Sequence, residues 1–311
     1  MVAPSASGYL PVTVIPIVLD SRNPNASVGS LKFLSGFELK SSDPRFGGFS
    51  GLTLSADGTV LYAVSDRGYW ASAKMRHDSE ARLSGLDSWE MDSLLTPEAS
   101  TVSGPLTDAE ALARDRDDGS LIVGFEQIHR LWRYRPPPAG LRVPPQPVPI
   151  PAELQKAPRN GGIEAVTVLL DGRIFILAEE FENPDGRLKG WLIDSQNFSE
   201  MSYVHSDRFR PTDMATLPNG DVLVLERRYG FLGNWGARFQ RLSRESLRPG
   251  ARVAAEEIAR IEPPLTLDNF EGLAVHKDEK GNLFIYIISD DNYSFFQRTL
   301  LLQFRLEAAG D

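Results

Sequence analysis

The chain has 311 residues, of which 41% are hydrophobic and 24% are charged, a composition typical of globular proteins. Its formal net charge is −9, and an acidic surface disfavours non-specific binding to nucleic acid or to an anionic membrane. The absence of cysteine excludes disulfides, zinc–thiolate sites, thiol catalysis and iron–sulfur ligation. No apolar run reaches the roughly 18 residues that a spanning helix needs, so we expect no membrane span.

A β-hairpin pattern recurs along the chain. Five copies, each with two short apolar runs around a glycine-containing turn, begin near residues 48, 108, 162, 211 and 268. Apolar runs of this length around such turns are typical of β-hairpins. The copies recur roughly every 50–60 residues, and each interval has room for further strands. Candidates for these are Ile128–Tyr134, Leu188–Ile193, Phe239–Leu242 and Leu300–Leu306.

The repeat predicts the fold class. A four-stranded unit at about this period is the signature of a propeller blade. We therefore predict an all-β protein, with residues 1–311 forming a single closed β-propeller of five four-stranded blades. The last blade lacks a fourth strand, which Leu31–Leu39 would supply from the N-terminus, leaving no open sheet edge. Six blades remain an alternative, because Val12–Leu19 is also strand-like.

Acidic residues stand near the start of the first strand in every copy but the first. They are Glu110, Glu164, Asp213 and Glu271, and the first copy has Ser50 instead. Innermost strands surround a central channel, where carboxylates a few Å apart repel by about 4 kcal/mol per pair at an effective dielectric of about 20. A hard divalent cation would relieve this repulsion, and a flexible site of roughly six to eight oxygens suits Ca²⁺. The alternative is scaffolding, in which the carboxylates accept backbone hydrogen bonds.

A second acidic set ends the second strand of each hairpin. Because hairpin strands are antiparallel, this end lies beside the start of the first strand, at the same mouth of the channel. The set is Asp66, Glu126, Glu179 or Glu180, Glu226 and Asp290. Carboxylates, guanidinium groups and a metal together favour binding of a small anionic ester. We assign substrate binding to Arg67, Arg227, Arg228, Glu126, Glu180 and Asp290, the alternative for each being a solvated loop rim.

These residues favour metal-dependent hydrolysis of an ester or phosphoester. A bound cation polarises a carbonyl or phosphoryl oxygen and lowers the pKa of a bound water, whose proton Glu226 or Asp66 would take. The sequence has no Gly-x-Ser-x-Gly elbow and no glycine-rich phosphate loop. The alternative function is a non-catalytic propeller that binds a small ligand or a protein partner around a structural cation.

Four motifs resemble a known family. The segments GGFSGLTLSADGTVLYAVSDRG, DAEALARDRDDGSLIVGFEQ, GGIEAVTVLLDGRIFILAEE and DNFEGLAVHKD are similar to the bacterial "esterase-like activity of phytase" family, over about Leu31 to Leu306. The resemblance implies a β-propeller, hydrolysis of phosphate or carboxylic esters, and export to the periplasm. No signal peptide is visible in residues 1–7. The fourth copy departs from the pattern, because Met214 follows Asp213 where other copies have glycine or alanine.

Overall fold

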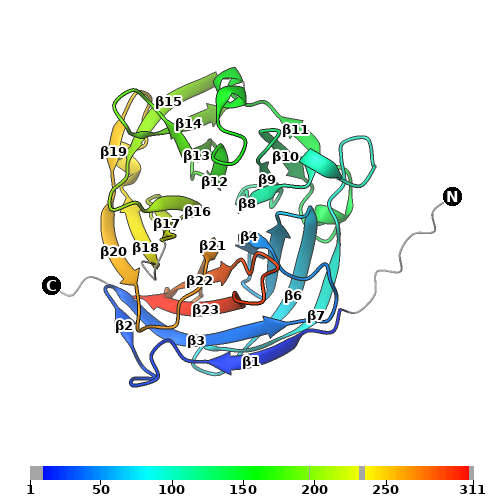
Figure 1. Ribbon diagram of the computed structural model, residues 1–311, viewed down its shortest axis with the longest axis vertical. Coiled ribbons are helices and arrows are strands. Elements are labelled where there is room, and N and C mark those ends of the chain that lie inside the picture. Colours follow the sequence, from blue (N-terminus) through cyan, green and yellow to red (C-terminus); the bar gives the residue numbers. More distant parts are fainter. Residues whose placement is uncertain (1–9, 196, 231–234, 308–311) are drawn as a thin grey trace.

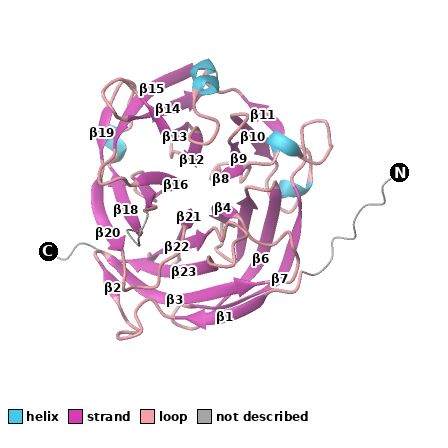
Figure 2. Ribbon diagram, viewed as in Figure 1, coloured by secondary structure: helices cyan, strands magenta, loops and turns pink. Residues whose placement is uncertain are grey.

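The computed structural model of the protein describes residues 10–195, 197–230 and 235–307. Its strands form five sheets arranged around a central axis, which confirms the predicted five-bladed β-propeller (Figure 1). Helical structure in the described chain is limited to short 3₁₀ turns at the periphery (Figure 2). These turns are Gly104–Leu106, Gly140–Arg142, Ala152–Lys156 and Arg244–Ser246.

Blades 1 and 2 are four-stranded antiparallel meanders that run from the axis outwards. Blade 1 contains β4 (Phe49–Leu54), β5 (Val60–Ser65), β6 (Tyr69–His77) and β7 (Leu83–Ser93). Blade 2 contains β8 (Ala109–Arg114), β9 (Leu121–Phe125), β10 (Arg130–Tyr134) and β11 (Gln146–Val148). The innermost strands β4 and β8 lie beside each other, so both present residues to the axis.

Blades 3 and 4 follow the same plan, and one short strand from the blade 4 segment of the chain joins the outer edge of blade 3. Blade 3 contains β12 (Ile163–Val168), β13 (Ile174–Glu182), β14 (Leu188–Asp194) and β15 (Asn197–Val204). Blade 4 contains β16 (Arg210–Thr216), β17 (Val222–Arg228), β18 (Gly236–Leu242) and β20 (Glu256–Ile261). The segment between β18 and β20 forms β19 (Arg252–Ala254), which pairs in parallel with β15 and so ties blade 4 to blade 3.

Blade 5 is completed by the N-terminal part of the chain. Its inner strands are β21 (Phe270–Lys277), β22 (Leu283–Ser289) and β23 (Thr299–Leu306). The fourth is β3 (Leu31–Lys40), which pairs antiparallel with β23. At the outer edge, β1 (Thr13–Ile17) and β2 (Ser27–Val28) both pair with β3. The alternative of six blades is wrong, because the strand within Val12–Leu19 extends blade 5 instead of starting another blade.

The hairpin turns follow from local sequence. In the Asn219-Gly220 turn, the N–H of Gly220 donates to the carbonyl of Leu217 at 3.0 Å. Gly220 has a φ of +93°, a conformation that glycine adopts without steric cost. Asparagine or aspartate before the glycine accepts a hydrogen bond within the turn, as the side chain of Asn219 does from the N–H of Asp221 at 3.1 Å. The turn therefore fixes the register of β16 on β17.

The hydrophobic core lies between the blades. Five clusters of buried apolar side chains occur, and each joins residues of two neighbouring blades. Phe304 of β23, for example, packs edge-on against Phe33 of β3 at 5.8 Å and near Phe239 of β18 at 6.1 Å between ring centroids. Each blade thus buries its faces against its neighbours, and closing the ring leaves no face uncovered. No helix in the described residues has the length and apolar character needed to cross a membrane.

We expect Phe304→Ala to lower the free energy of unfolding by about 3–5 kcal/mol, because it leaves a cavity where blade 4, blade 5 and the closing strand meet. Phe295→Ala is the matched control, since Phe295 is 96% exposed and its loss should change stability by less than about 0.5 kcal/mol. Chemical denaturation followed by circular dichroism measures both. Equal effects of the two substitutions would show that the interface between these blades contributes little.

Candidate functional site

Every innermost strand has a β-bulge near its start. The ladder skips one residue in each blade, so that this residue is unpaired. We call these residues the bulge ring; they are Ser50, Glu110, Glu164, Thr212 and Glu271. A bulge locally reorients its side chain, which explains why the same position recurs in all blades. The ring contains three of the four carboxylates predicted from the sequence.

A second ring lies beside the first. In each blade, the residue before the bulge pairs with a residue of the second strand, and the second ring consists of the residues that directly follow these partners. We call this set the return ring; it comprises Asp66, Glu126, Glu179, Arg227 and Asp290. The two rings and Asp108 form what we call the channel mouth. Of the two possibilities Glu179 and Glu180, the ladder selects Glu179.

In blade 4, the bulge lies one residue earlier than the comparison of the five sequence repeats predicts. The equivalence assumed for Asp213 is wrong, since Thr212 occupies the bulge and Asp213 pairs with Leu225. For the same reason Glu226 is not the return-ring residue, because it pairs with Pro211 and Arg227 follows it. Arg227 therefore corresponds to Asp66, not to Arg67. One slipped residue in a strand exchanges the faces of all its side chains.

Asp213 ties blades together across the axis. It is fully buried, and its carboxylate accepts the N–H of Leu273 at 2.7 Å and of Met214 at 2.8 Å. A third backbone hydrogen bond comes from Leu52 of blade 1. Burial raises the pKa of Asp213 well above its usual value, although the three N–H groups act in the opposite direction. Its oxygens are thus occupied by backbone donors, as in the scaffolding alternative, and we leave Asp213 out of the proposed metal ligands.

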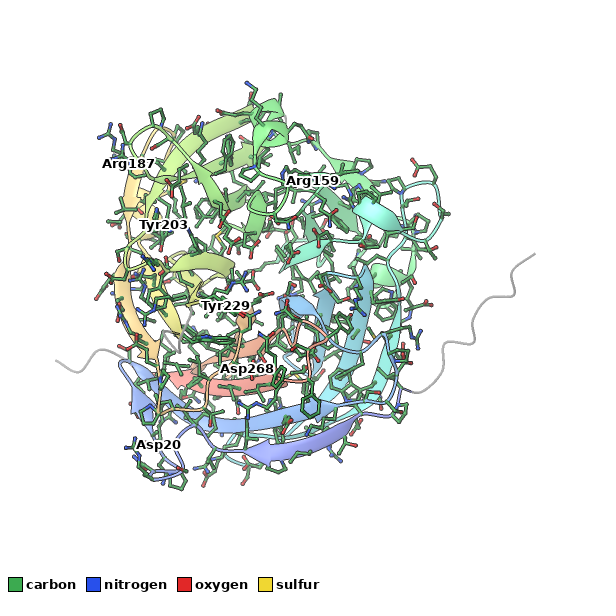
Figure 3. All side chains as sticks on the ribbon, in the orientation of Figure 1. Asp20, Arg159, Arg187, Tyr203, Tyr229 and Asp268 are labelled. Carbon is green, nitrogen blue, oxygen red and sulfur yellow. The ribbon has the colours of Figure 1, made fainter. Side chains whose placement is uncertain are left out.

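Glu226 is also engaged in the interior. Its side chain is fully buried, accepts the Tyr203 hydroxyl at 2.8 Å and pairs with Arg238 Nε at 2.6 Å. Tyr203 belongs to β15, an outer strand of blade 3 (Figure 3). The expectation that Glu226 faces the channel mouth is wrong, because the one-residue shift turns it into the interface between blades 3 and 4. This placement removes it as a candidate proton acceptor.

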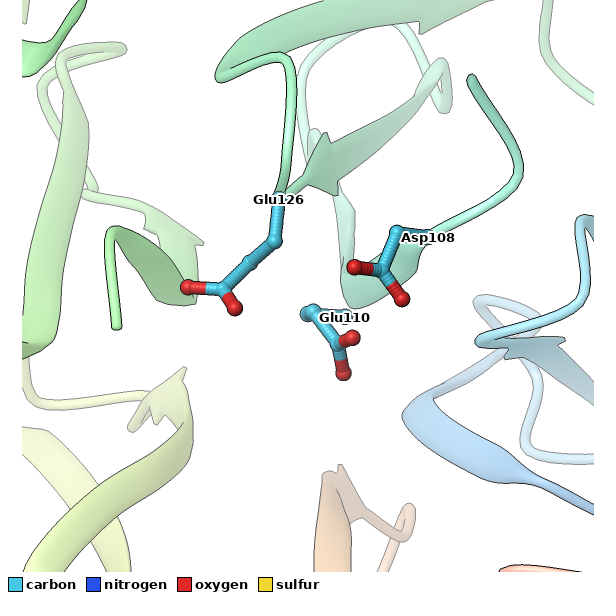
Figure 4. A group of neighbouring side chains, drawn as sticks. All are labelled: Asp108, Glu110 and Glu126. Carbon is cyan, nitrogen blue, oxygen red and sulfur yellow. The ribbon is translucent and has the colours of Figure 1, made fainter. Parts of the chain in front are cut away.

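One group of carboxylates has the spacing of a metal site. The ligand atoms of Asp108, Glu110 and Glu126 all lie within 4.8 Å of one another. Figure 4 shows the three side chains beside one another, at the start of β8 and directly after the end of β9. Asp108 was not among the candidate ligands predicted from the sequence. Its spacing of two residues from Glu110 was the available signal, because alternate residues of an extended chain point to the same side.

Glu126 is held in place by the neighbouring blade. Its Oε1 accepts the N–H of Gly161 at 2.7 Å and also the N–H of Gly162. A Cβ at position 162 would lie 2.1 Å from Cε1 of His129, so only glycine allows this close approach. The paired glycines before Ile163 therefore fix the orientation of a carboxylate in blade 2, which leaves its second oxygen for a ligand.

Arg227 neutralises another part of the channel mouth. Its guanidinium pairs with Glu271, lies 3.4 Å from Oε1 of Glu179 and donates to Oδ1 of Asn269 at 2.7 Å. Asn269 also donates to Glu271 at 2.7 Å. Burial lowers the pKa of Arg227, but the carboxylates of Glu271 and Glu179 outweigh this and raise that pKa. Arg227 is thus an internal counter-charge, not a free substrate ligand.

Asp66 and Arg67 form a different corner of the mouth. Asp66 is partly buried, and its Oδ1 has no hydrogen-bond partner among the described residues. The exposed Arg67 lies over the ring of Tyr293, with its guanidinium carbon 3.3 Å from the centroid. Ser50 Oγ is likewise buried without a partner in the described chain. A carboxylate oxygen, a hydroxyl and a guanidinium group therefore remain for a ligand in blade 1.

Of the remaining predicted substrate ligands, Asp290 lies in the channel mouth, whereas Glu180 and Arg228 lie outside the two rings. Asp290 is 4% exposed and accepts the N–H of Asn292 at 2.6 Å, within the channel mouth. Glu180 is exposed and follows the return ring instead of belonging to it. Arg228 pairs with Glu262 at 2.6 Å and contacts the ring of Phe209, in the outer part of blade 4. Of these three residues, only Asp290 is part of the carboxylate group.

Crowding changes the ionisation of the carboxyl groups. Burial, followed by neighbouring carboxylates, raises the pKa of Asp66 to about 7 and of Asp290 to about 8. Burial also raises the pKa of Glu126 to about 8, against the two glycine N–H groups. The pKa values of Glu110 and Glu164 are raised well above the usual range by burial and by the surrounding carboxylates. At neutral pH the mouth thus retains protons that a cation would displace.

The fold and these rings define a β-propeller with a carboxylate-lined channel mouth. A family model described as "Esterase-like activity of phytase" matches residues 44–293, and the chain belongs to this Phytase-like family. None of the curated proteins matches the sequence.

Solved structures are similar over most of the chain, but at low identity. A protein of unknown function from Dyadobacter fermentans is 12% identical, with 96% of this chain and 95% of that chain covered, at a TM-score of 0.47. A gluconolactonase from Xanthomonas campestris is 9% identical, with 96% and 99% covered, at a TM-score of 0.43. A protein of unknown function from Bacteroides caccae is 5% identical, with 78% and 68% covered, at 0.34. These values are too low to carry an argument about function.

We expect the stability of metal-free protein to fall as the pH rises from about 5 to 8. The folded carboxyls hold their protons up to a pKa of about 7 for Asp66 and about 8 for Glu126, whereas unfolded carboxyls ionise near pH 4. Within this window the folded state binds more protons than the unfolded state. The free energy of unfolding therefore falls by up to about 1.4 kcal/mol per pH unit for each such group.

Thermal melts at a series of pH values, in protein stripped of metal, measure this slope. Glu164→Gln should flatten it, because one of the buried acids no longer ionises. The control is Glu80→Gln, since the side chain of Glu80 is 70% exposed and should leave the slope unchanged. A stability that is constant over this range would contradict the raised pKa values.

Proposed function

We propose that the protein is a metal-dependent hydrolase of esters or phosphoesters that acts at the channel mouth, with Ca²⁺ as the cation. The observation that carries the proposal is the group Asp108, Glu110 and Glu126, whose ligand atoms lie within 4.8 Å of one another. Membership of the Phytase-like family, described by esterase-like activity, supports the hydrolytic reaction.

The donor set suits a hard cation. Asp108, Glu110 and Glu126 offer oxygen ligands only, which Ca²⁺ prefers, and water would complete the roughly six to eight oxygens it takes. The Gly161 and Gly162 N–H groups orient Glu126 from the neighbouring blade, in the manner of the outer-shell contacts that support metal ligands. The unpartnered Ser50 Oγ supplies a further oxygen in the adjoining blade.

In this proposal Asp66 is the general base. In the metal-free protein, burial is the main cause that raises its pKa to about 7, and a carboxylate of raised pKa accepts a proton more readily than an ordinary one. When bound, the cation supplies Lewis-acid polarisation of the ester oxygen and a water of lowered pKa. Asp66 accepts the proton of the attacking water at Oδ1, the oxygen without a partner. Arg67 holds the anionic part of the substrate, for which a guanidinium group is well suited.

Arg227 has a different part in the proposed mechanism from the one its sequence suggests. Because it is paired with Glu271 and near Glu179, it limits the negative charge of the mouth instead of binding substrate. Among the described residues, the channel-mouth carboxylates of blade 2 have no arginine or lysine in salt-bridge contact. The proposed metal ligands therefore lie where the internal counter-charge is absent.

We expect Ca²⁺ to raise the melting temperature at pH 7.5 and a chelator to lower it, because a cation that binds only the folded state stabilises it by mass action. Glu110→Gln should abolish the difference between the two conditions. Glu38→Gln, a change in the outer strand β3, should preserve it. Elemental analysis of the purified protein identifies the metal. An unchanged melting temperature, with no metal in the purified protein, would mean that the carboxylates are scaffolding.

We expect chelator-sensitive turnover of at least one compound in a panel of carboxylic esters and phosphomonoesters. Asp66→Asn should reduce kcat by about 10²–10⁴, since the base contributes to proton transfer. Arg67→Gln should mainly raise KM. Asp87→Asn, on the outer strand β7, is the control with a matched change of charge. Turnover that is equally fast in Asp66→Asn and wild type would rule out Asp66 as the base.

A second candidate is a non-catalytic propeller that binds a protein at this face. Phe295 and Phe296 are 96% and 91% exposed, and they lie on the loop between β22 and β23 that begins at Asp290. Exposed aromatic side chains are enriched among residues that anchor protein interfaces. This candidate replaces the first if the panel gives no chelator-sensitive turnover while Ca²⁺ still stabilises the protein.

A further inference from the structure

The far end of the channel, opposite the mouth, is basic. Arg114 is the last residue of β8, and His276 and Lys277 are the last two of β21, whereas Glu110 and Glu271 stand near the starts of the same strands. A cavity of about 370 Å³ opens at this end, and Arg116 also lines it. Among the described residues, no aspartate or glutamate lines this cavity. In a chain of net charge −9, this is a local reversal of sign.

The two arginines of the cavity have no acidic partner in the described chain. Arg114 Nε donates to the carbonyl of Leu54 at 3.0 Å, and Arg116 Nη2 donates to the carbonyl of Thr216. Burial lowers the pKa of both guanidinium groups, and the charge of Arg114 lowers that of Arg116 further. Two guanidinium groups thus lie close enough to repel, with further N–H groups available to an acceptor.

The nearest acidic side chains are already engaged. Asp57 accepts hydrogen bonds from Ser55 and Thr59 within its own turn. Asp115 pairs with Arg133 at 2.8 Å. These carboxylates act on Arg114 only from a distance, and neither lines the cavity. The positive charge at this end is therefore not neutralised by direct contact.

The inner part of the cavity is apolar. Leu112, Val168, Met214 and Leu273 line it, all of them buried side chains of innermost strands. Asp213 does not line the cavity, but its carboxylate accepts hydrogen bonds from the backbone of two lining residues, Met214 and Leu273. The volume is at the lower end of the roughly 300–1,000 Å³ usual for small-molecule sites. The cavity thus combines a basic rim with a small apolar interior.

We propose that this far-end cavity binds a small organic phosphate, with the phosphate group on Arg114 and Arg116 and the apolar part against Leu112 and Val168. Guanidinium groups form paired hydrogen bonds with phosphate oxygens, and two of them match a dianion. Lys277 and His276 add donors at the rim. The site is separate from the channel mouth, and it does not depend on the proposed hydrolase activity.

Isothermal titration calorimetry with phenylphosphonate, which resists hydrolysis, tests the proposal. We expect phenylphosphonate to bind more tightly than inorganic phosphate, because its ring adds apolar contact, and benzyl alcohol to give no binding. The double variant Arg114→Gln, Arg116→Gln should lower the affinity for phenylphosphonate by about tenfold or more, because charge-assisted hydrogen bonds are lost. Arg76→Gln, on the outer part of blade 1, is the control and should bind as wild type does.

Two further measurements exclude binding at the mouth. The titration is repeated with and without Ca²⁺, and with Arg67→Gln, which removes the exposed arginine of the mouth. Binding by the far-end cavity is unchanged in both cases. If Arg67→Gln abolishes binding and the double variant does not, the anion binds at the mouth and the proposal is wrong.

Folding of the variants is checked by circular dichroism and thermal melts. If the double variant does not fold, Arg116→Gln and Lys277→Gln replace it as single changes at exposed side chains, and each should weaken binding. The proposal would also be overturned if wild type gave no heat of binding with phenylphosphonate at millimolar concentration. Absence of ester turnover would count only against the hydrolase activity.

Discussion

Electrostatic repulsion among the carboxylates at the channel mouth is the constraint on which the rest of the site depends. Five innermost strands converge on one axis, and carboxylates a few Å apart repel by about 4 kcal/mol per pair at an effective dielectric of about 20. The chain relieves this in three ways: Arg227 pairs with Glu271, backbone N–H groups hold Glu126, and several carboxyls retain protons. The divalent cation that we propose would be a fourth way, and it would also contribute to the chemistry of the site.

The propeller could be predicted from the sequence because the information is local. Each hairpin has its own turn residues and apolar runs, and repetition at a nearly constant interval does not depend on distant contacts. The closing strand was also predictable, since the last blade is one strand short. The site was predicted less well, because it depends on single-residue register. Thr212 rather than Asp213 fills the bulge, and matching acidic residues by type hid this shift.

Other parts of the site could not be read from the sequence. The Asp213 side chain ties together blades 1, 4 and 5, which are distant in sequence. In the other blades, the residue that follows the bulge is glycine or alanine. Arg114 and Lys277 are ordinary strand-terminal residues in the sequence, and only the assembled ring brings them to one cavity. Every innermost strand runs from the acidic end of the channel toward the basic end, so the strands align two opposite charges on one axis.

The closing strand has a consequence for the order in which the chain is made. Ser35 hydrogen-bonds to Gln303 at 3.0 Å across 268 residues, so β3 waits for its partner β23, which is synthesised much later. Until then, the edge of β3 that pairs with β23 is free, and an unpaired strand edge can associate with other chains. A circular permutant that starts at β4 and carries β3 after β23 would bring the two partners together as soon as they are made. The pairing of β3 with β23 therefore constrains the order in which the propeller folds as well as its final structure.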